Sequence, residues 1–432
     1  MIMPINIKKT TVLYMKLLFL VSILFYLQYV RATDFRYSAD YEYAYYENIN
    51  NVLAPVSNEY SNALVGRFSV LENSGYLNAS VNGQLRTTQY KNNITSDRTR
   101  ARVSVLSTWV LRPKSVEWFL SDVFTQTTIN SLISDTPDNR QNINTFSTGP
   151  DFSIKLNSLN RIIIKPRIES YLFQVGNDNV RIKNDLEWEY SINSTITMQL
   201  NQVLEKVDFQ KDNLNPDRTR NDLFVSLISV KALNRLQLDL GRTRVNDDFG
   251  RNFDNPRFKL SISSQRNHNT LFNLSYGVRI TDVGRYIAAQ NAPVSSLDNA
   301  SLSLFQNTTS RLGIVRQISS GSLSLTYSNL LREFEVTPEL NQQQSNLALS
   351  GKLALTGLSK LYFSLYKSKK DFLNDIDGRI YNDSSYSIKY AYTIRRNLFF
   401  NMNVSTRERS SNIAEAEYKS PKIILSIQYS SF

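Results

Sequence analysis

The chain has 432 residues, of which 41% are hydrophobic and 20% charged, with 50 Lys and Arg against 38 Asp and Glu. It contains no Cys and one His, which excludes a disulfide-rich scaffold, a Cys-ligated metal centre and a His-cluster metal site. Only one stretch, near the N-terminus, approaches the length of about 20 apolar residues that a membrane-spanning helix needs, so a helical membrane protein is also excluded.

The first 32 residues have the pattern of an export signal. Three lysines precede an apolar run at 17–30, and a small-residue cleavage pattern follows at 30–32. We therefore expect a signal peptide at 1–32 and one mature domain at 33–432; the alternatives are a membrane anchor and a later start at Met15. Residues 1–32 carry four basic residues and no acidic one, so their removal lowers the net charge from +12 to +8.

From Phe35 onward the apolar residues recur with a period of two, which favours strands over helices. At 35–43 the odd positions are Phe, Tyr or Ala, and the even positions are polar or charged. At 181–190 charged odd positions alternate with even positions that are apolar except for Asn184. No helix could sort these residues onto two opposite faces, and we find no convincing amphipathic helix longer than two turns.

The connectors between these segments alternate in length along the whole chain. Long polar connectors are expected at 47–58, 91–97, 128–148, 174–180, 209–218, 246–256, 282–298, 336–344, 371–382 and 409–417. Tight turns are expected near Asn73, Pro113, Ser158, Asn193, Leu233, Asn267, Ser320, Gly357 and Arg396. This pattern gives about 20 strands, within a range of roughly 16 to 20, with short turns on one side and long loops on the other.

These features predict an all-β fold, a transmembrane up-and-down antiparallel β-barrel. In hydrocarbon every backbone amide must be paired within the protein, so a sheet survives there only by closing on itself. A soluble sandwich of this length would need more than one domain, and no linker rich in Pro, Gly or Ser divides the chain. A propeller or solenoid is the other alternative, but the sequence has no regular blade-length repeat.

The aromatic residues and the C-terminus fit an outer-membrane protein. Trp109, Tyr45 and Tyr429 are candidates for the aromatic girdles at the two membrane interfaces. The chain ends in Phe432, and a last strand that ends in Phe resembles the signal by which the bacterial machinery for barrel assembly recognises its clients. Phe432 is out of phase with Tyr429, so either a bulge lies at Ser430–Ser431 or the resemblance is imperfect.

Two segments resemble a known family. The tyrosine-rich stretch from Tyr41 to Val52, and the run from Thr136 to Leu156 with Trp118 and Asp122 before it, are similar to outer-membrane β-barrels of porin type found with exopolysaccharide and PEP-CTERM protein-sorting loci. The resemblance implies a location in the outer membrane of a Gram-negative bacterium and a link to exopolysaccharide biosynthesis or export. It implies no catalytic residue.

Basic residues mark the expected lumen. The sequence Asp-Arg-Thr-Arg occurs at 97–100 and at 217–220, each time closing a long loop and starting a strand whose apolar face turns the arginines inward. The cations expected to face the lumen, where they could contact an anion or a polysaccharide, are Arg86, Arg98, Arg100, Arg102, Arg181, Lys183, Arg218, Arg220 and Arg235. Such a pore attracts anions. The alternative is that these arginines pair with nearby acids to stiffen the rim, or bind lipopolysaccharide phosphates.

No enzymatic site is predicted. The only His, His268, lies in an expected tight turn on the periplasmic side, and the loop acids Asp247 and Asp248 show no sign of a buried carboxylate pair. We therefore expect no catalytic residue, no metal and no cofactor. Nucleic acid is not expected as a partner either, because an exported protein rarely meets it.

The sequence thus predicts a non-enzymatic outer-membrane barrel linked to exopolysaccharide, with a polar lumen and a basic outer mouth. The expected partners are outer-membrane lipid and lipopolysaccharide, the barrel-assembly machinery, and an anionic polysaccharide or other components of its export. The loop from Thr128 to Thr148 is the expected constriction, and no separate plug domain is expected before the first strand. The alternatives are a general diffusion porin with mild anion preference and an outer-membrane hydrolase.

Overall fold

The computed structural model describes residues 34–54, 58–128, 140–210, 216–282 and 304–431, so the predicted signal peptide at 1–32 lies outside the described residues. The described residues form 20 strands and two short 3-10 helices, η2 (Pro338–Leu340) and η3 (Ala414–Ala416). The strands are β1 (Asp34–Tyr46), β2 (Glu59–Asn73), β3 (Leu77–Tyr90), β4 (Arg98–Arg112), β5 (Val116–Thr128), β6 (Arg140–Lys155), β7 (Asn160–Phe173), β8 (Asn179–Ser191), β9 (Ile196–Phe209), β10 (Arg218–Lys231), β11 (Asn234–Asp247), β12 (Asn252–Asn267), β13 (Thr270–Thr281), β14 (Phe305–Ile318), β15 (Gly321–Phe334), β16 (Gln342–Ala354), β17 (Ser359–Phe372), β18 (Ile380–Arg395), β19 (Leu398–Ser411) and β20 (Tyr418–Ser430). Within these residues no helix is long and apolar enough to cross a membrane.

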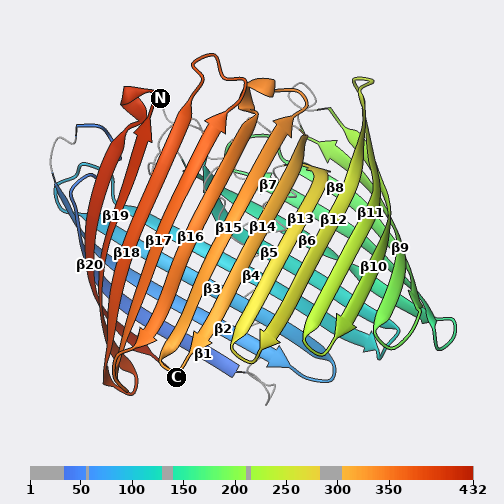
Figure 1. Cartoon of the computed structure of the whole chain (residues 1–432), viewed down its shortest axis with the longest axis horizontal. Coiled ribbons are helices and arrows are strands. Elements are labelled where there is room, and N and C mark those ends of the chain that lie inside the picture. The colour runs from blue at the N-terminus through green and yellow to red at the C-terminus, as the bar shows by residue number, and fades with distance from the viewer. Residues whose placement is uncertain (1–33, 55–57, 129–139, 211–215, 283–303, 432) are drawn as a thin grey trace.

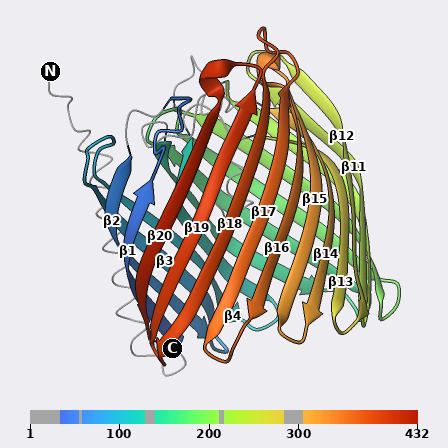
Figure 2. The same cartoon turned by 60° about the vertical axis from the view of Figure 1, so that its left-hand side comes forward.

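The strands form one closed barrel. Each strand pairs antiparallel with the strands before and after it in the chain, and β20 pairs with β1 from Ser38–Ser430 to Tyr46–Lys422. Figure 2 shows β1 lying beside β20, and Figure 1 shows the front and back walls with their strands tilted in opposite directions, as barrel closure requires. The predicted antiparallel barrel is confirmed, and its 20 strands match the predicted number.

The two ends of the barrel differ. The nine predicted tight turns all join neighbouring strands at one end, which we call the turn end, together with the start of β1 and the last residues of β20. The other ten connections leave and re-enter the sheet at the opposite end, which we call the loop end; nine of them span five residues or more, and the one between β11 and β12 spans four. The alternation of connector lengths in the sequence therefore locates both ends correctly.

Two expected loops are much shorter than predicted. The connector expected at 246–256 spans only 248–251, because β11 extends to Asp247 and β12 begins at Asn252. The connector expected at Thr128–Thr148 ends at 139, because β6 already begins at Arg140 and pairs with β5 from Thr128–Arg140 onward. Near the loop end both faces of β6 carry polar side chains, so the alternation that marks a strand elsewhere is missing from its sequence. The prediction that this whole segment constricts the lumen is therefore wrong for residues 140–148, which belong to β6. Residues 129–139 lie outside the described part of the chain.

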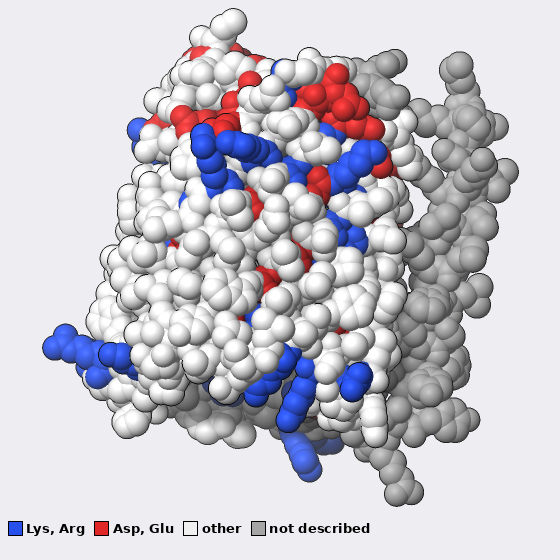
Figure 3. Space-filling view, turned by 90° about the vertical axis from the view of Figure 1, so that its right-hand side faces the viewer, with Lys and Arg blue, Asp and Glu red and all other residues white. Residues whose placement is uncertain are grey.

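The register separates an apolar outer face from a polar inner face. Tyr41 on β1 pairs with Leu64 on β2 on the outer face, and these residues are 50% and 65% exposed. Asp40 and Glu42, the neighbours of Tyr41 in the chain, point inward and are buried. Figure 3 shows the outcome on one side of the barrel, where a band almost without charged side chains separates a charged zone near the loop end from another near the turn end. This banding is typical of a barrel that is embedded in lipid.

Aromatic residues lie on the outer face near both ends. By register the three Trp residues, Trp109, Trp118 and Trp188, all face outward near the turn end. Tyr429 faces outward at the same end and Tyr45 at the loop end.

The C-terminal strand stays in register with β1. The backbone N–H of Ser431 donates to the carbonyl oxygen of Tyr37 at 2.9 Å, in line with the pairing of Ser430 and Ser38. No bulge interrupts the pairing of β20 with β1 from Lys422 to Ser431, so of the two alternatives the bulge at Ser430–Ser431 is wrong. Phe432 itself lies outside the described residues.

Candidate functional site in the barrel lumen

Four charged side chains meet inside the loop end, and we call them the mouth cluster: Arg181 on β8, Glu205 on β9, Arg218 on β10 and Asp282, which follows β13. The guanidinium of Arg181 donates two hydrogen bonds of 2.9 Å to the carboxylate of Asp282, and Nη2 of Arg218 lies 2.9 Å from the same carboxylate. Glu205 Oε1 accepts a third bond from Arg181 at 3.3 Å. The side chain of Arg181 is 0% exposed, so its charge depends on these partners.

The mouth cluster joins parts of the wall that are not neighbours. β8 and β13 do not pair in the sheet, so the contact between Arg181 and Asp282 crosses the interior of the barrel. Asn255 Nδ2 on β12 also donates a hydrogen bond to Gln306 Oε1 on β14 at 3.0 Å, between two strands that both flank β13. The loop end of the lumen is therefore narrowed by described residues of the wall itself.

An apolar cluster reinforces this closure. It combines buried side chains from β6, β7 and β9 with others from β14, β15 and η2: Ile143, Tyr171, Phe173, Val207, Phe209, Phe305, Phe334 and Leu340. The guanidinium of Arg181 lies 4.1 Å from the centre of the Tyr171 ring, within the range of a cation–π contact. Charged and apolar contacts thus hold the same two regions of wall together.

Below the mouth cluster lies a charged cavity of about 280 Å³, which we call the basic cavity. Five cationic and three acidic side chains line it, which leaves an excess of two positive charges: Lys165, Lys183, Arg220, Arg257 and Arg279 against Asp185, Glu187 and Asp222. Asp222 binds two of the cations, at 2.8 Å from Arg220 and 3.1 Å from Arg257. Inside a low-dielectric wall, such an excess attracts anions more strongly than it would in open water.

The structure brings together four of the nine cations expected in the lumen. Arg181 and Arg218 belong to the mouth cluster, and Lys183 and Arg220 line the basic cavity directly below them. All four lie close to carboxylates. Arg181 and Arg218 contact Asp282, Arg220 contacts Asp222, and Lys183 lies 2.7 Å from Asp185. Their pairing with acids agrees with the alternative of a stiffened rim, whereas the charge excess of the cavity agrees with anion attraction.

The other five cations face inward by register but lie elsewhere. Arg86, Arg98, Arg100 and Arg102 are on β3 and β4, where Nη2 of Arg86 lies 2.8 Å from Glu42 and Nη2 of Arg98 donates to the hydroxyl of Tyr90 at 2.6 Å. Arg235 lies near the turn end of β11, so it does not belong to the outer mouth. The lumen therefore carries several separate basic regions.

The two Asp-Arg-Thr-Arg segments share a local structure. Asp97 accepts a hydrogen bond of 2.7 Å from the backbone N–H of Tyr90, the last residue of β3. Asp217 does the same for Phe209, the last residue of β9, also at 2.7 Å. The following arginines, Arg98 and Arg218, lie over the rings of these same two residues, at 5.5 and 5.2 Å. The repeat is thus a device that closes a loop and sets an arginine against an aromatic ring.

Sequence reasoning missed several residues of the site. Glu205 and Asp222 lie in phase with the predicted inward face of β9 and β10, so the alternation could have placed them there. Arg257 was within reach of the same argument, because it alternates with Pro256 and Phe258 on β12. Asp282 follows a strand end in a long connector, and no local pattern indicates that it turns into the lumen.

No arrangement typical of catalysis or metal binding appears at these sites. His268 is exposed in the turn between β12 and β13 at the turn end, far along the strand from the mouth cluster. Among the described residues no group of three or more His, Cys, Asp or Glu could hold a metal ion. The described side chains that line the lumen are charged and polar groups, which can bind charged solutes.

The barrel and its charged lumen define a class of protein, the large single-chain barrels. Among solved structures, the iron transporter FrpB of Neisseria meningitidis (F3-3 variant) matches with a TM-score of 0.54 at 9% identity, over 92% of this chain and 81% of that one. The siderophore receptor PirA of Pseudomonas aeruginosa matches with a TM-score of 0.48 at 12% identity, over 92% and 80%. No family model and no curated protein sequence matches the chain. The likeness to FrpB supports the barrel fold.

Proposed function

We propose that this chain is a non-enzymatic barrel of the bacterial outer membrane, whose basic lumen takes up or passes anionic solutes in the assembly or export of an exopolysaccharide. The observation that carries the proposal is the basic cavity, with its excess of two positive charges. It lies beneath a mouth that is narrowed by the contact of Arg181 with Asp282 across the lumen. The resemblance of Tyr41–Val52 and Thr136–Leu156 to barrels found with exopolysaccharide loci supports the cargo class.

The location in the outer membrane rests on the outer face. The apolar band between two charged zones and the outward Trp residues near the turn end suit contact with lipid tails and headgroups. On the outer face of β11 and β12, Arg242 and Arg244 lie beside Asp254 near the loop end, where lipopolysaccharide phosphates would be in reach. The barrel-assembly machinery remains the expected partner for the C-terminal strand.

A general diffusion porin is the main alternative. It requires a permanently open lumen, and the contact from Arg181 to Asp282 favours a narrowed one. An outer-membrane hydrolase is disfavoured, because His268 is exposed at the turn end without a described carboxylate or serine arranged as a triad around it. At 9% identity the iron cargo of FrpB is not carried over to this chain.

Ion selectivity in planar lipid bilayers tests the proposal. The wild-type barrel is expected to show small, gated conductance steps in which chloride is more permeant than potassium. Replacing the arginines of both Asp-Arg-Thr-Arg segments (R98Q, R100Q, R218Q and R220Q) removes four inward charges and should lower the chloride preference at least about twofold.

The matched control for this experiment changes two outward arginines. R242Q with R244Q alters charges that are 61% and 63% exposed on the outer face, so the selectivity should stay at the wild-type value. Cation selectivity of the wild type contradicts the proposal. A large conductance that never closes also contradicts it and favours a porin. Unchanged selectivity of the fourfold variant would assign those arginines to the loop closures alone.

A further inference from the structure

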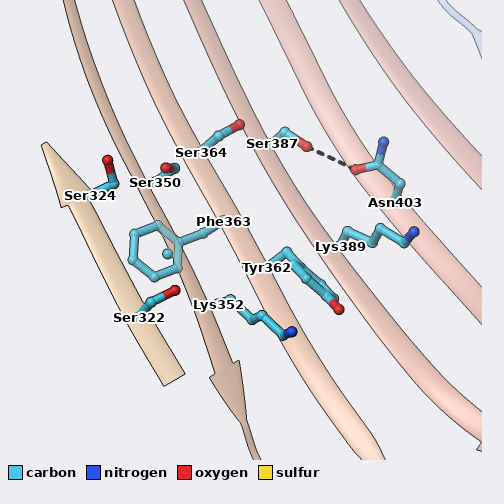
Figure 4. A pocket seen from close by; sticks show the side chains of 11 residues that line it. Ser322, Ser324, Ser350, Lys352, Tyr362, Phe363, Ser364, Ser387, Lys389 and Asn403 are labelled. Carbon is cyan, nitrogen blue, oxygen red and sulfur yellow. Dashed lines mark hydrogen bonds between the residues drawn. The ribbon is translucent and has the colours of Figure 1, made fainter. Parts of the chain in front are cut away.

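A second cavity, of about 410 Å³, lies on the inner wall at the turn end, on β15 to β19, and we call it the lysine–serine pocket. It is formed by strands that contribute nothing to the basic cavity. Two rows of residues that pair across neighbouring strands line it (Figure 4). One row is Ser322, Lys352, Tyr362, Lys389 and Asn403, and the other is Ser324, Ser350, Ser364 and Ser387.

The charge of this pocket is not compensated within the part of the chain that the structure describes. Lys352 and Lys389 form no ion pair there, and no Asp or Glu lines the pocket. In the basic cavity, by contrast, Lys183 lies 2.7 Å from Asp185 and Lys165 lies 3.7 Å from Glu187. Two ammonium groups that share a concave wall without a carboxylate repel each other, and an anionic ligand would relieve this repulsion.

An aromatic ring lies between the two lysines. Tyr362 pairs with Lys352 on one side and with Lys389 on the other, and the ammonium groups lie 5.9 and 5.8 Å from the centre of its ring. The two lysines are therefore two strands apart, about 9.5 Å between their backbones. A ligand that meets both lysines and covers the ring needs a flat body with anionic groups at its edges.

The second row supplies neutral hydrogen-bonding groups. Its four serines stand side by side on four neighbouring strands, and the hydroxyl of Ser387 donates to Oδ1 of Asn403 at 2.9 Å, which orients the amide. A hydroxyl can donate and accept, so the row matches a ligand that is itself rich in hydroxyl groups. A small inorganic anion would leave most of these groups unused.

We propose that the lysine–serine pocket binds an acidic saccharide, with its carboxylate or phosphate groups on Lys352 and Lys389, a sugar ring against Tyr362 and sugar hydroxyls on the serine row. The volume falls within the range of about 300–1,000 Å³ that is usual for ligand pockets. The inference rests on the proposed function for the cargo class, and it adds a specific site at the end of the lumen opposite the mouth cluster.

Calorimetry on the purified full chain in lipid nanodiscs tests this site. The probes are trigalacturonate, maltotriose as a neutral sugar with the same number of rings, and inorganic phosphate. Trigalacturonate is expected to bind at least about tenfold more tightly than either of the others, because only it offers both charges and hydroxyls. The double variant K352Q/K389Q should lose at least about tenfold in affinity for trigalacturonate, and Tyr362→Ser should also weaken binding.

The control variant K155Q/K259Q removes two other lysines that face inward by register on β6 and β12, outside the pocket, and should bind as the wild type does. Equal binding by K352Q/K389Q and the wild type, phosphate binding as tight as that of trigalacturonate, or no binding by the wild type overturns the proposal. Ion selectivity measured on the same preparation separates the two claims. An anion-selective barrel that does not bind trigalacturonate refutes this site alone, whereas a cation-selective barrel refutes the proposed function.

Discussion

The most constrained residue in the lumen is Arg181. Its buried guanidinium binds Asp282 and Glu205, while Arg218 shares the carboxylate of Asp282. Two cations and two anions balance, which is the condition under which charges can be buried at all. The stability of the loop end therefore depends on a single carboxylate that serves two arginines.

Replacing that carboxylate should be costly. Asp282→Asn deprives two buried guanidinium groups of a charged partner, so we expect the free energy of unfolding to fall by about 3 kcal/mol, measured by urea unfolding in lipid vesicles. Asp377→Asn is the control, since Asp377 is 54% exposed beside Arg379, and it should cost less than about 1 kcal/mol. Equal losses for the two variants would mean that the mouth cluster does not hold the loop end together.

At the level of single residues, the sequence predicts which way a side chain points better than it predicts which residue it contacts. Strand phase indicated that Arg98, Arg181 and Arg218 face inward, and the register agrees. It could not indicate that Asp282 bridges two arginines, because that contact depends on how the end of β13 turns into the barrel. Alternation encodes one face of one strand, whereas a contact across the lumen depends on the shape of the whole barrel.

The strands themselves follow from local chemistry. An isolated strand with one apolar and one polar face cannot bury its apolar face. When each strand pairs with both of its neighbours, the apolar faces come together on one side of a continuous sheet. All nine tight turns were predictable, because each interrupts the alternation for only a few residues. The longer connectors were predicted less well, as for β6, because strands extend past the apolar band into regions where both faces are polar.

Introducing a charge should destabilise the barrel far more at an outward position of a strand than at the neighbouring inward position. Leu347 lies at the middle of β16, faces outward and is 45% exposed, whereas Ala348 faces the lumen. Leu347→Arg should lower the free energy of unfolding by about 2–4 kcal/mol in lipid vesicles, because the charge meets hydrocarbon, and Ala348→Arg should cost less than about 1 kcal/mol. If Ala348→Arg proves as costly as Leu347→Arg, the assignment of the two faces is wrong.

For the whole molecule, closure connects all of these observations. The pairing of β20 with β1 removes the free sheet edges, turns the apolar faces outward and encloses the polar ones. Charge then divides along the barrel, with paired charges at the mouth, a basic cavity below them and, at the turn end, two lysines of the lysine–serine pocket that form no ion pair with a described residue. An anionic solute that enters the mouth would meet basic regions along its path.

Fluorescence of the three Trp residues tests the central claim, that lipid covers the outer face of this barrel. Trp109, Trp118 and Trp188 face outward near the turn end. In vesicles of brominated lipids we expect strong quenching, greater when bromine lies near the headgroup end of the acyl chain than when it lies near the terminal methyl group. Fluorescence that brominated lipid leaves unchanged but that aqueous iodide quenches fully would contradict the account.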